Sequence, residues 1–211
     1  MLRTASALEL RLWVAALLCL CASIALGLYV SQRTPARIDV DAVALRGTAV
    51  DAALFFTALG RWPVLLGLGL AATAIAYKLR TGLTAVAIVY VTQILSQGAS
   101  TLLKLGLHRT RPDGWLMIRE TDFSYPSGHA ATAVVFFVGF AILAWHAPFP
   151  RPAAAAISAV LLVCAIGIPW SRLALGAHYL TDVIGGLLLG AAFLCAALAL
   201  IVHVHSPAAA A

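Results

Sequence analysis

The amino-acid sequence predicts an all-α, polytopic membrane protein: a bundle of six transmembrane helices with one short interfacial helix. Hydrophobic residues make up 63% of the 211 residues and charged residues only 10%, whereas a soluble domain carries about 25% charged residues. The apolar residues also gather in runs close to the roughly 20 residues that a spanning helix needs. At this length we expect a single integral-membrane domain over residues 1–211.

The N-terminal part of the chain predicts one span, a surface loop and the interfacial helix. Leu12–Val30 is long and apolar enough to cross a bilayer. The polar residues 31–47 predict a loop at the membrane surface. Ala52–Gly60 is apolar but short, and it is followed by Trp62, a residue type that favours headgroup depth. We therefore expect this segment to lie in the interface.

Five further apolar runs complete the predicted bundle. The first is barely long enough to span, and it opens with a proline, which suits the first turn of a helix. The last contains Gly186-x3-Gly190, a spacing that suits close helix packing. The runs are Pro63–Tyr77, Leu83–Leu103, Ala130–Trp145, Ala153–Trp170 and Val183–Val202.

Three polar clusters fall near the ends of these runs. Six spans alternate sides, so the topology places all three clusters on one face of the membrane. Ionisable groups are costly within a membrane and therefore mark a functional site. The clusters read Lys104-x6-Arg111-Pro112, then Pro126-Ser127-Gly128-His129, then Ser171-Arg172-x5-His178-x3-Asp182.

The first two clusters have the chemistry to hold an anion. Arg111 offers a planar donor fork that matches phosphate oxygens, and Lys104 adds a point charge. Ser127 is placed to cap a helix N-terminus, where free N–H groups favour anions, and Gly128 allows the backbone to approach closely. Taken singly, a snorkelling Lys–Arg pair and an ordinary helix cap explain the same residues.

The third cluster pairs an imidazole with a carboxylate. His178 and Asp182 are four residues apart, so on a helix they would share a face. A carboxylate that accepts from one ring nitrogen fixes the tautomer and leaves the other nitrogen able to attack. A helix-end His–Asp pair without a role is the alternative for this cluster alone. The cations, this pair and His129 together indicate a phosphate-transfer site.

All three clusters resemble the motifs of the type 2 phosphatidic acid phosphatase (PAP2) superfamily, which read K-x6-R-P, P-S-G-H and S-R-x5-H-x3-D. Every specified position matches within residues 104–182. The resemblance implies that His178 is the nucleophile, that Asp182 orients it, and that His129 protonates the leaving group. It also implies a set of residues that hold the phosphoryl oxygens. These are Lys104, Arg111, Ser127, Gly128 and Arg172.

The resemblance implies no cofactor and no metal, because three cations neutralise the phosphoryl charge. The remaining acidic residues, Asp113, Glu120 and Asp122, have no trusted metal-ligand spacing. The motif leaves His108 and Arg109 unassigned. A solvated basic loop is the simpler interpretation of these two residues, and contact with a headgroup or a second phosphate is the alternative.

The expected function is hydrolysis of a membrane lipid phosphate, such as undecaprenyl pyrophosphate, phosphatidylglycerophosphate, phosphatidate or a lipid A phosphate. A phosphotransferase with the same chemistry and a non-catalytic lipid phosphate transporter are the alternatives. The expected partners are the bilayer and its lipid phosphates. No basic run suggests nucleic acid, and no obligate protein partner is evident.

The expected location is the bacterial cytoplasmic membrane. The resemblance favours an active site on the periplasmic or outer face. The distribution of Lys and Arg favours the reverse orientation, because nine of the 14 cations fall on the same side as the site.

Overall fold

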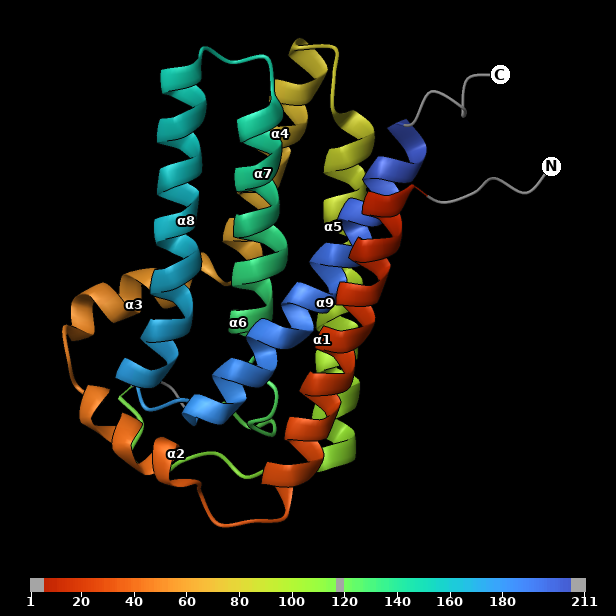
Figure 1. Cartoon of the computed structure of the whole chain (residues 1–211). Helices are drawn as coiled ribbons and strands as arrows, with labels where there is room; N and C mark the ends of the chain where they lie inside the picture. The colour runs from red at the N-terminus through yellow and green to blue at the C-terminus, as the bar shows by residue number, and fades with distance from the viewer. Residues whose placement is uncertain (1–5, 117–119, 206–211) are drawn as a thin grey trace.

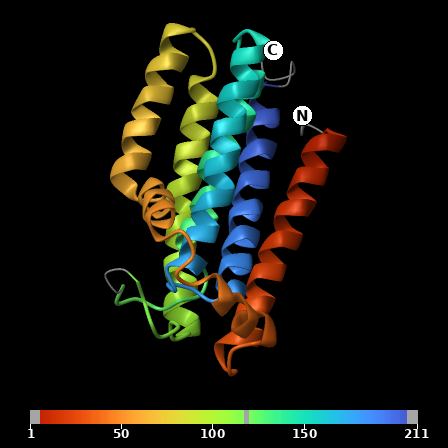
Figure 2. The same ribbon diagram turned by 90° about the vertical axis from the view of Figure 1, so that its left-hand side faces the viewer.

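The computed structural model describes residues 6–116 and 120–205, and all regular elements in these ranges are helical. Four helices of 24 to 26 residues run up and down the molecule (Figures 1 and 2). A fifth long run is continuous from Gly128 to His146, and its middle part is a π-helix. The long helices are α1 (Ala7–Ser31), α5 (Leu83–Leu107), α8 (Arg151–Ala174) and α9 (Leu180–His205), and the fifth run consists of α6 (Gly128–Thr132), η2 (Ala133–Val138) and α7 (Gly139–His146).

Five of the described helical runs are long and apolar enough to cross a membrane. The remaining predicted span is α4 (Trp62–Lys78), an apolar helix of 17 residues. At 1.5 Å per residue it is about 26 Å long, short of the roughly 30 Å hydrocarbon core. It runs antiparallel to α5 (Figure 1). The prediction of an all-α, multipass membrane protein is confirmed, and the helix at the predicted second span is shorter than the five candidate spans.

The segment 31–47 is not simply a loop, and that prediction was wrong. It contains α2 (Arg37–Asp41) and a 3₁₀ helix, η1 (Ala42–Leu45). Oδ2 of Asp39 stabilises the start of α2 by accepting a hydrogen bond from the amide of Ala36 at 3.2 Å. The following helix, α3 (Val50–Leu59), is bent by 111° from this segment. It lies across the long helices (Figure 1), close to the predicted Ala52–Gly60.

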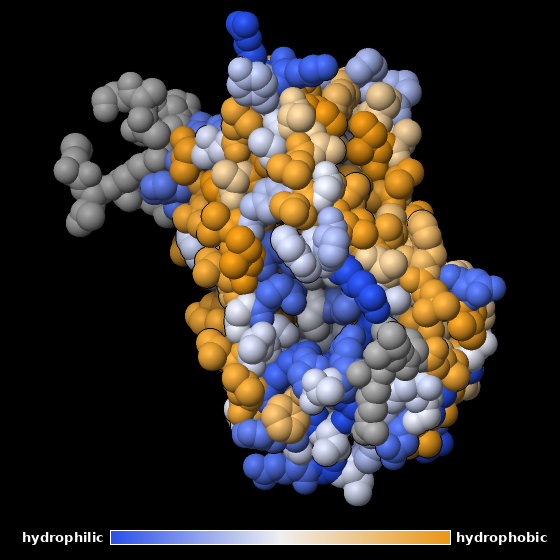
Figure 3. Space-filling view, turned by 180° about the vertical axis from the view of Figure 1, so that it is seen from behind, coloured by the Kyte–Doolittle hydropathy of each residue, from blue (hydrophilic) through white to orange (hydrophobic). Residues whose placement is uncertain are grey.

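The bundle has an aromatic core and an apolar outer surface. Phe136, Phe137 and Phe140 pack together with Val89 and Ile168. Many large apolar side chains lie exposed on the outside of the bundle. Such a surface suits a protein whose outer face contacts lipid tails. From behind, hydrophobic residues cover much of the upper part and the flanks, and hydrophilic residues line a hollow in the lower half (Figure 3).

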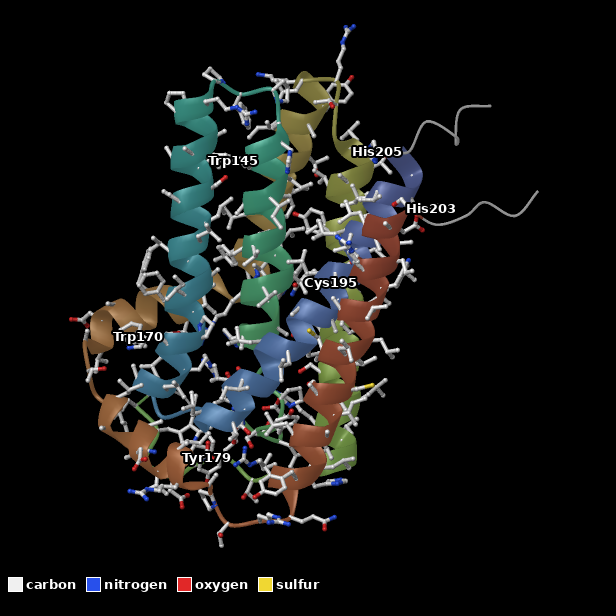
Figure 4. The ribbon with its side chains drawn as sticks, in the orientation of Figure 1. Trp145, Trp170, Tyr179, Cys195, His203 and His205 are labelled. Carbon is white, nitrogen blue, oxygen red and sulfur yellow. The ribbon has the colours of Figure 1, made fainter. Side chains whose placement is uncertain are left out.

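The first and last long helices bring the beginning and end of the described chain together. α1 packs along α9, and Nδ1 of His203 lies 3.0 Å from Oε1 of Glu9. His203 and His205 mark this end in Figure 4, and Tyr179 marks the opposite end. The polar clusters gather near Tyr179, as shown below.

Candidate active site

The structure brings the three sequence clusters together at one end of the bundle. Nη1 of Arg111 lies 3.1 Å from Nε2 of His178, which joins the first cluster to the third. The amide of Ser127 donates to the carbonyl of Asp182 at 3.0 Å, which joins the second to the third. These contacts link residues that are 55 to 67 positions apart in the chain.

His178 lies just before α9 rather than on it, so the expectation that His178 and Asp182 share a helical face was wrong. The two side chains nevertheless meet, with Nδ1 of His178 3.4 Å from Oδ2 of Asp182. The turn that makes this possible is closed by the amide of Tyr179, which donates to the same Oδ2 at 2.9 Å. Asp182 therefore both lies in the first turn of α9 and faces the imidazole.

The electrostatic environment of His178 favours a neutral ring. Burial, and then the charges of Arg111 and Arg172, hold the pKa of His178 well below its ordinary value. A neutral imidazole that faces Asp182 through Nδ1 has its lone pair on Nε2. That nitrogen points toward the guanidinium of Arg111, which is the direction in which an anionic phosphoryl group would be held.

Arg172 reaches the site because α8 continues one turn beyond the predicted end at Trp170. Its side chain is fully buried. Nη1 donates to Oγ1 of Thr57 at 2.6 Å, and Nη2 donates to Oε1 of Glu120 at 2.7 Å. Thr57 belongs to α3, so the helix that lies across the bundle contributes directly to the site.

Two carboxylates that the motif does not include bind the three cations. Glu120 bridges two guanidinium groups, with Oε2 2.8 Å from Nη2 of Arg111 and Oε1 on Arg172. Asp122 forms ion pairs with Lys104 and Arg111. The donors expected to hold a phosphoryl group thus bind carboxylate oxygens in this structure.

These carboxylates are ionised at neutral pH. Burial raises the pKa of Glu120, but the charges of Arg172 and Arg111 outweigh burial and hold it below its ordinary value. The pKa of Asp122 is likewise lowered, because Lys104 and Arg111 outweigh its burial. Both therefore compete as anions for the same donors.

The Pro126–His129 turn begins the fifth long run. Oγ of Ser127 caps α6 by accepting from the amide of Ala130 at 3.5 Å. His129 follows in the first turn, and a Cβ atom added to Gly60 would lie 2.5 Å from its Cδ2 atom. Within the described residues, the buried Nε2 of His129 has no hydrogen-bond partner.

Tyr125 anchors this turn from the other side. It is fully buried, and its hydroxyl donates to the carbonyl of Ser23 in α1. Burial raises the pKa of Tyr125 to about 12, so the hydroxyl stays a donor. Added Cβ atoms at Gly27 and Gly185 would lie 2.5 Å and 2.3 Å from its ring. These two glycines make room for the ring between α1 and α9.

His108 and Arg109 differ in their surroundings. His108 is exposed, and its ring packs edge-on against Phe123, 4.6 Å between centroids. Arg109 is buried and binds Asp182 through Nη1 at 2.5 Å. The solvated-loop interpretation was therefore wrong for Arg109. Within residues 6–116 and 120–205, no group of three or more His, Cys, Asp or Glu side chains is arranged to hold a metal.

Comparison with known proteins gives relatives that include lipid phosphatases. The chain is 38% identical over 117 residues to a lipid A 1-phosphatase of Rhizobium etli, a match that covers 51% of this chain and 46% of the relative. It is 37% identical over 90 residues to phosphatidylglycerophosphatase B of Bacillus subtilis, covering 42% of this chain and 44% of the relative. The chain therefore spans less than half the length of these curated relatives.

A solved structure has the same fold. The crystal structure of a transmembrane PAP2-type phosphatidylglycerolphosphate phosphatase from Bacillus subtilis matches with a TM-score of 0.70 and 23% identity. The match covers 94% of this chain and 98% of that one. The family profile of the PAP2 superfamily matches residues 82–205, more than half of the chain and all three motifs. The chain belongs to the PAP2 superfamily.

Proposed function

We propose that this protein is a membrane lipid phosphatase that hydrolyses a phosphomonoester or diphosphate of a lipid through a phosphohistidine intermediate. The names of its relatives support a lipid phosphate as the substrate class. One observation carries the mechanism. The two nitrogens of His178 face opposite partners, with Nδ1 toward Asp182 at 3.4 Å and Nε2 toward Arg111 at 3.1 Å.

In the first step Nε2 of His178 attacks phosphorus, and the bond between phosphorus and the lipid oxygen breaks. Asp182 stabilises the imidazolium character that develops on the ring. His129 gives a proton to the leaving oxygen. Arg111, Arg172 and Lys104 bind the equatorial oxygens, where charge is spread in the transition state.

In the second step water attacks the phosphohistidine. His129 takes a proton from the water, the N–P bond breaks, and inorganic phosphate leaves with His178 restored. Ser127 and Gly128 contribute the beginning of α6, whose N-terminal amides favour an anion. The three cations supply the charge neutralisation that the reaction requires, so the proposed mechanism uses no metal.

The position of the site suits a substrate whose tail stays in the bilayer. The polar cluster lies at one end of a bundle whose outside is apolar. A lipid could remain in the membrane while its phosphate enters the cluster. Short polar segments around the site favour a simple phosphate or diphosphate end over a large headgroup.

We further propose that the site faces the outside of the bacterial cytoplasmic membrane. Of the nine cations on the site's side, Lys104, Arg111 and Arg172 belong to the proposed phosphate site, and Arg109 is buried against Asp182. Five remain on that side and five on the other. The positive-inside rule then favours neither orientation. We therefore follow the expectation from the PAP2 resemblance, which is an active site on the outer face.

Phosphate release from purified protein in detergent tests the proposed function. The panel contains phosphatidylglycerophosphate, phosphatidate, undecaprenyl diphosphate and a lipid A phosphate, each with and without an acceptor alcohol. Wild type and the control His205→Ala, at the opposite end of the bundle (Figure 4), should release inorganic phosphate from at least one lipid, and His178→Ala should release none. A lack of release from every lipid would refute the proposal, and transfer to the alcohol in place of release would identify a phosphotransferase.

A further inference from the structure

The two carboxylate oxygens of Asp182 have separate partners. Oδ2 faces Nδ1 of His178 and accepts from the amide of Tyr179. Oδ1 accepts from Nη1 of Arg109 at 2.5 Å. Because both oxygens are engaged from different directions, the plane of the carboxylate is fixed. The direction from which it meets the imidazole is then fixed as well.

Arg109 is itself held on several sides. Nη1 also donates to Oγ1 of Thr181 at 2.6 Å, and Nη2 donates to Oδ2 of Asp39 at 2.9 Å. The ring of Tyr179 lies 4.5 Å from the centre of the guanidinium. The side chain is only 5% exposed. A planar fork with partners on both terminal nitrogens has little freedom to rotate.

Asp39 extends this network to a distant part of the chain. It belongs to α2, and its side chain is fully buried. Oδ1 accepts from the amide of Thr181 at 2.8 Å and from its hydroxyl at 2.9 Å. The surface segment between α1 and α3 is thereby joined to the first turn of α9, one residue before Asp182.

The charges in this network are unequal. Two buried carboxylates, Asp39 and Asp182, share one guanidinium, which leaves one formal negative charge. Buried charges are stable only when well paired and hydrogen-bonded. Asp39 pairs with Nη2 of Arg109 and Asp182 pairs with Nη1. The positive charge of Arg109 is therefore shared between two carboxylates and does not neutralise Asp182 alone. Asp182 thus remains able to stabilise positive charge on His178.

We propose that Arg109 and Asp39 are positioning residues for the His178–Asp182 pair. Arg109 sets the orientation of the Asp182 carboxylate, and Asp39 sets the orientation and charge balance of Arg109. Their side-chain contacts described above are with one another, with Thr181, Tyr179 and Asp182 and with the amide of Ala36, and not with the three phosphate-binding cations. This inference rests on the proposed function, in which His178 is the nucleophile.

This arrangement predicts a loss of turnover rather than of substrate binding. The hydrogen-bonding partners of metal ligands typically contribute about 10–100-fold to activity, and by analogy kcat should fall by about that factor in Asp39→Asn and Arg109→Gln. KM should stay within about twofold of wild type. Arg109→Lys should fall between wild type and Arg109→Gln, because an ammonium keeps the charge but cannot span both carboxylates.

The experiment measures kcat and KM on the best lipid of the panel for these three variants and for the double variant Asp39→Asn/Arg109→Gln. The double variant should lose no more than the worse single variant, because both residues act through Asp182. Asp41→Asn and Arg37→Gln are the matched controls, since both are exposed on the same helix α2. Size-exclusion profiles and thermal midpoints in detergent report the folded state of each variant.

Three outcomes would overturn the inference: kcat within about twofold of wild type in Asp39→Asn and Arg109→Gln, an effect confined to KM, or an equal fall in Asp41→Asn. Failure of all three variants to give folded protein would also overturn it, because the network would then serve only the fold. His178→Ala is measured in parallel. If it retained activity, the proposed mechanism would fail, and not the positioning role alone.

Discussion

The main-chain amide of Ser127 donates a hydrogen bond to the main-chain carbonyl of Asp182 at 3.0 Å. This bond joins the turn that begins α6 to the first turn of α9, and so it sets the histidine of the second motif relative to that of the third. One helical turn after Asp182, Gly186 allows the approach, because a Cβ atom there would lie 2.3 Å from the Ser127 carbonyl oxygen.

Gly186→Ala should therefore lower both the stability of the protein and its rate of turnover. The obstructing atom belongs to the backbone and cannot rotate away, so we expect a loss of about 1–3 kcal/mol in stability together with a lower kcat. Thermal midpoints and turnover in detergent measure both effects. Gly98→Ala is the control, since a Cβ at Gly98 meets no atom within 4 Å. Equal thermal midpoints and equal turnover in Gly186→Ala and Gly98→Ala would contradict the close packing at Gly186.

His178→Ala should abolish turnover by several orders of magnitude while lipid binding survives, because the attacking atom is gone. Asp182→Asn should cost less, since it spoils the orientation of the ring and not its nitrogen. Steady-state rates with a lipid-binding assay on the same preparations test this. Retention of more than about a tenth of the wild-type rate in His178→Ala would refute the mechanism.

In the pH dependence of kcat/KM, the loss of activity caused by protonation of His178 should occur below about pH 6.5, the ordinary pKa of histidine. The pKa of a neutral buried histidine is depressed, so the ring gains its proton only below the ordinary value of about 6.5. Activity carried by this group is therefore present above its folded-state pKa and is lost as the pH falls through it. A profile that falls with an apparent pKa near 6.5 or above, and that shifts in Asp182→Asn, would contradict this assignment.

Activity should persist in excess EDTA, because Lys104, Arg111 and Arg172 provide the positive charge that the phosphoryl group requires. Orthovanadate should inhibit, since it mimics five-coordinate phosphorus beside a histidine. Phosphate release with and without each reagent tests the prediction. Complete loss in chelator that magnesium restores would show that the three cations do not suffice.

Glu120→Gln should strengthen phosphate binding at the site. The wild-type carboxylate bonds the guanidinium groups of Arg111 and Arg172, and its loss frees charge-assisted donors that are each worth roughly 1.5–3 kcal/mol. We expect the inhibition constant of inorganic phosphate to fall about tenfold. Asp113→Asn, an exposed acid in the same loop, provides the same charge change away from these donors. Weaker phosphate inhibition in Glu120→Gln would contradict this prediction and would indicate that the carboxylate holds Arg111 and Arg172 in position for phosphate.

Cysteine labelling tests the side of the membrane. In a background without the four native cysteines, a cysteine replacing the exposed Asp113 should react with an impermeant thiol reagent in intact cells. A cysteine replacing Arg80, exposed at the other end of the bundle, should react only after the membrane is opened. The reverse pattern would invert the proposed orientation, and equal labelling of both would contradict the count of spans.

The sequence predicted much of the bundle because the apolar runs are long and the motifs are closely spaced. It underestimated α8, because the predicted span ends at Trp170 whereas the helix continues to Ala174. It missed α2, since a helix of five residues carries almost no periodic signal. Its only local sign was Asp39 placed three residues after Ala36, the spacing of a capping box.

Within the site, the residues that sequence reasoning missed are those that act through tertiary contacts. Glu120 and Asp122 were examined only as metal ligands, although the nearby excess of cations was a sign that carboxylates would pair with them. Arg109 lay inside a motif whose intervening positions are unspecified. Asp39 is 143 residues from Asp182 in the sequence, and no spacing rule connects two positions so far apart.

The bridge from Glu120 to Arg111 and Arg172 means that the site carries its own counter-ion, covalently tethered to the chain. A tethered group acts at an effective concentration on the order of millimolar or more, whatever the ionic composition outside. Arrival of substrate then becomes an exchange of one anion for another, and departure of inorganic phosphate is assisted by the returning carboxylate. Dilute monovalent anions should compete poorly in this exchange, whereas a doubly charged phosphate group can displace the tether.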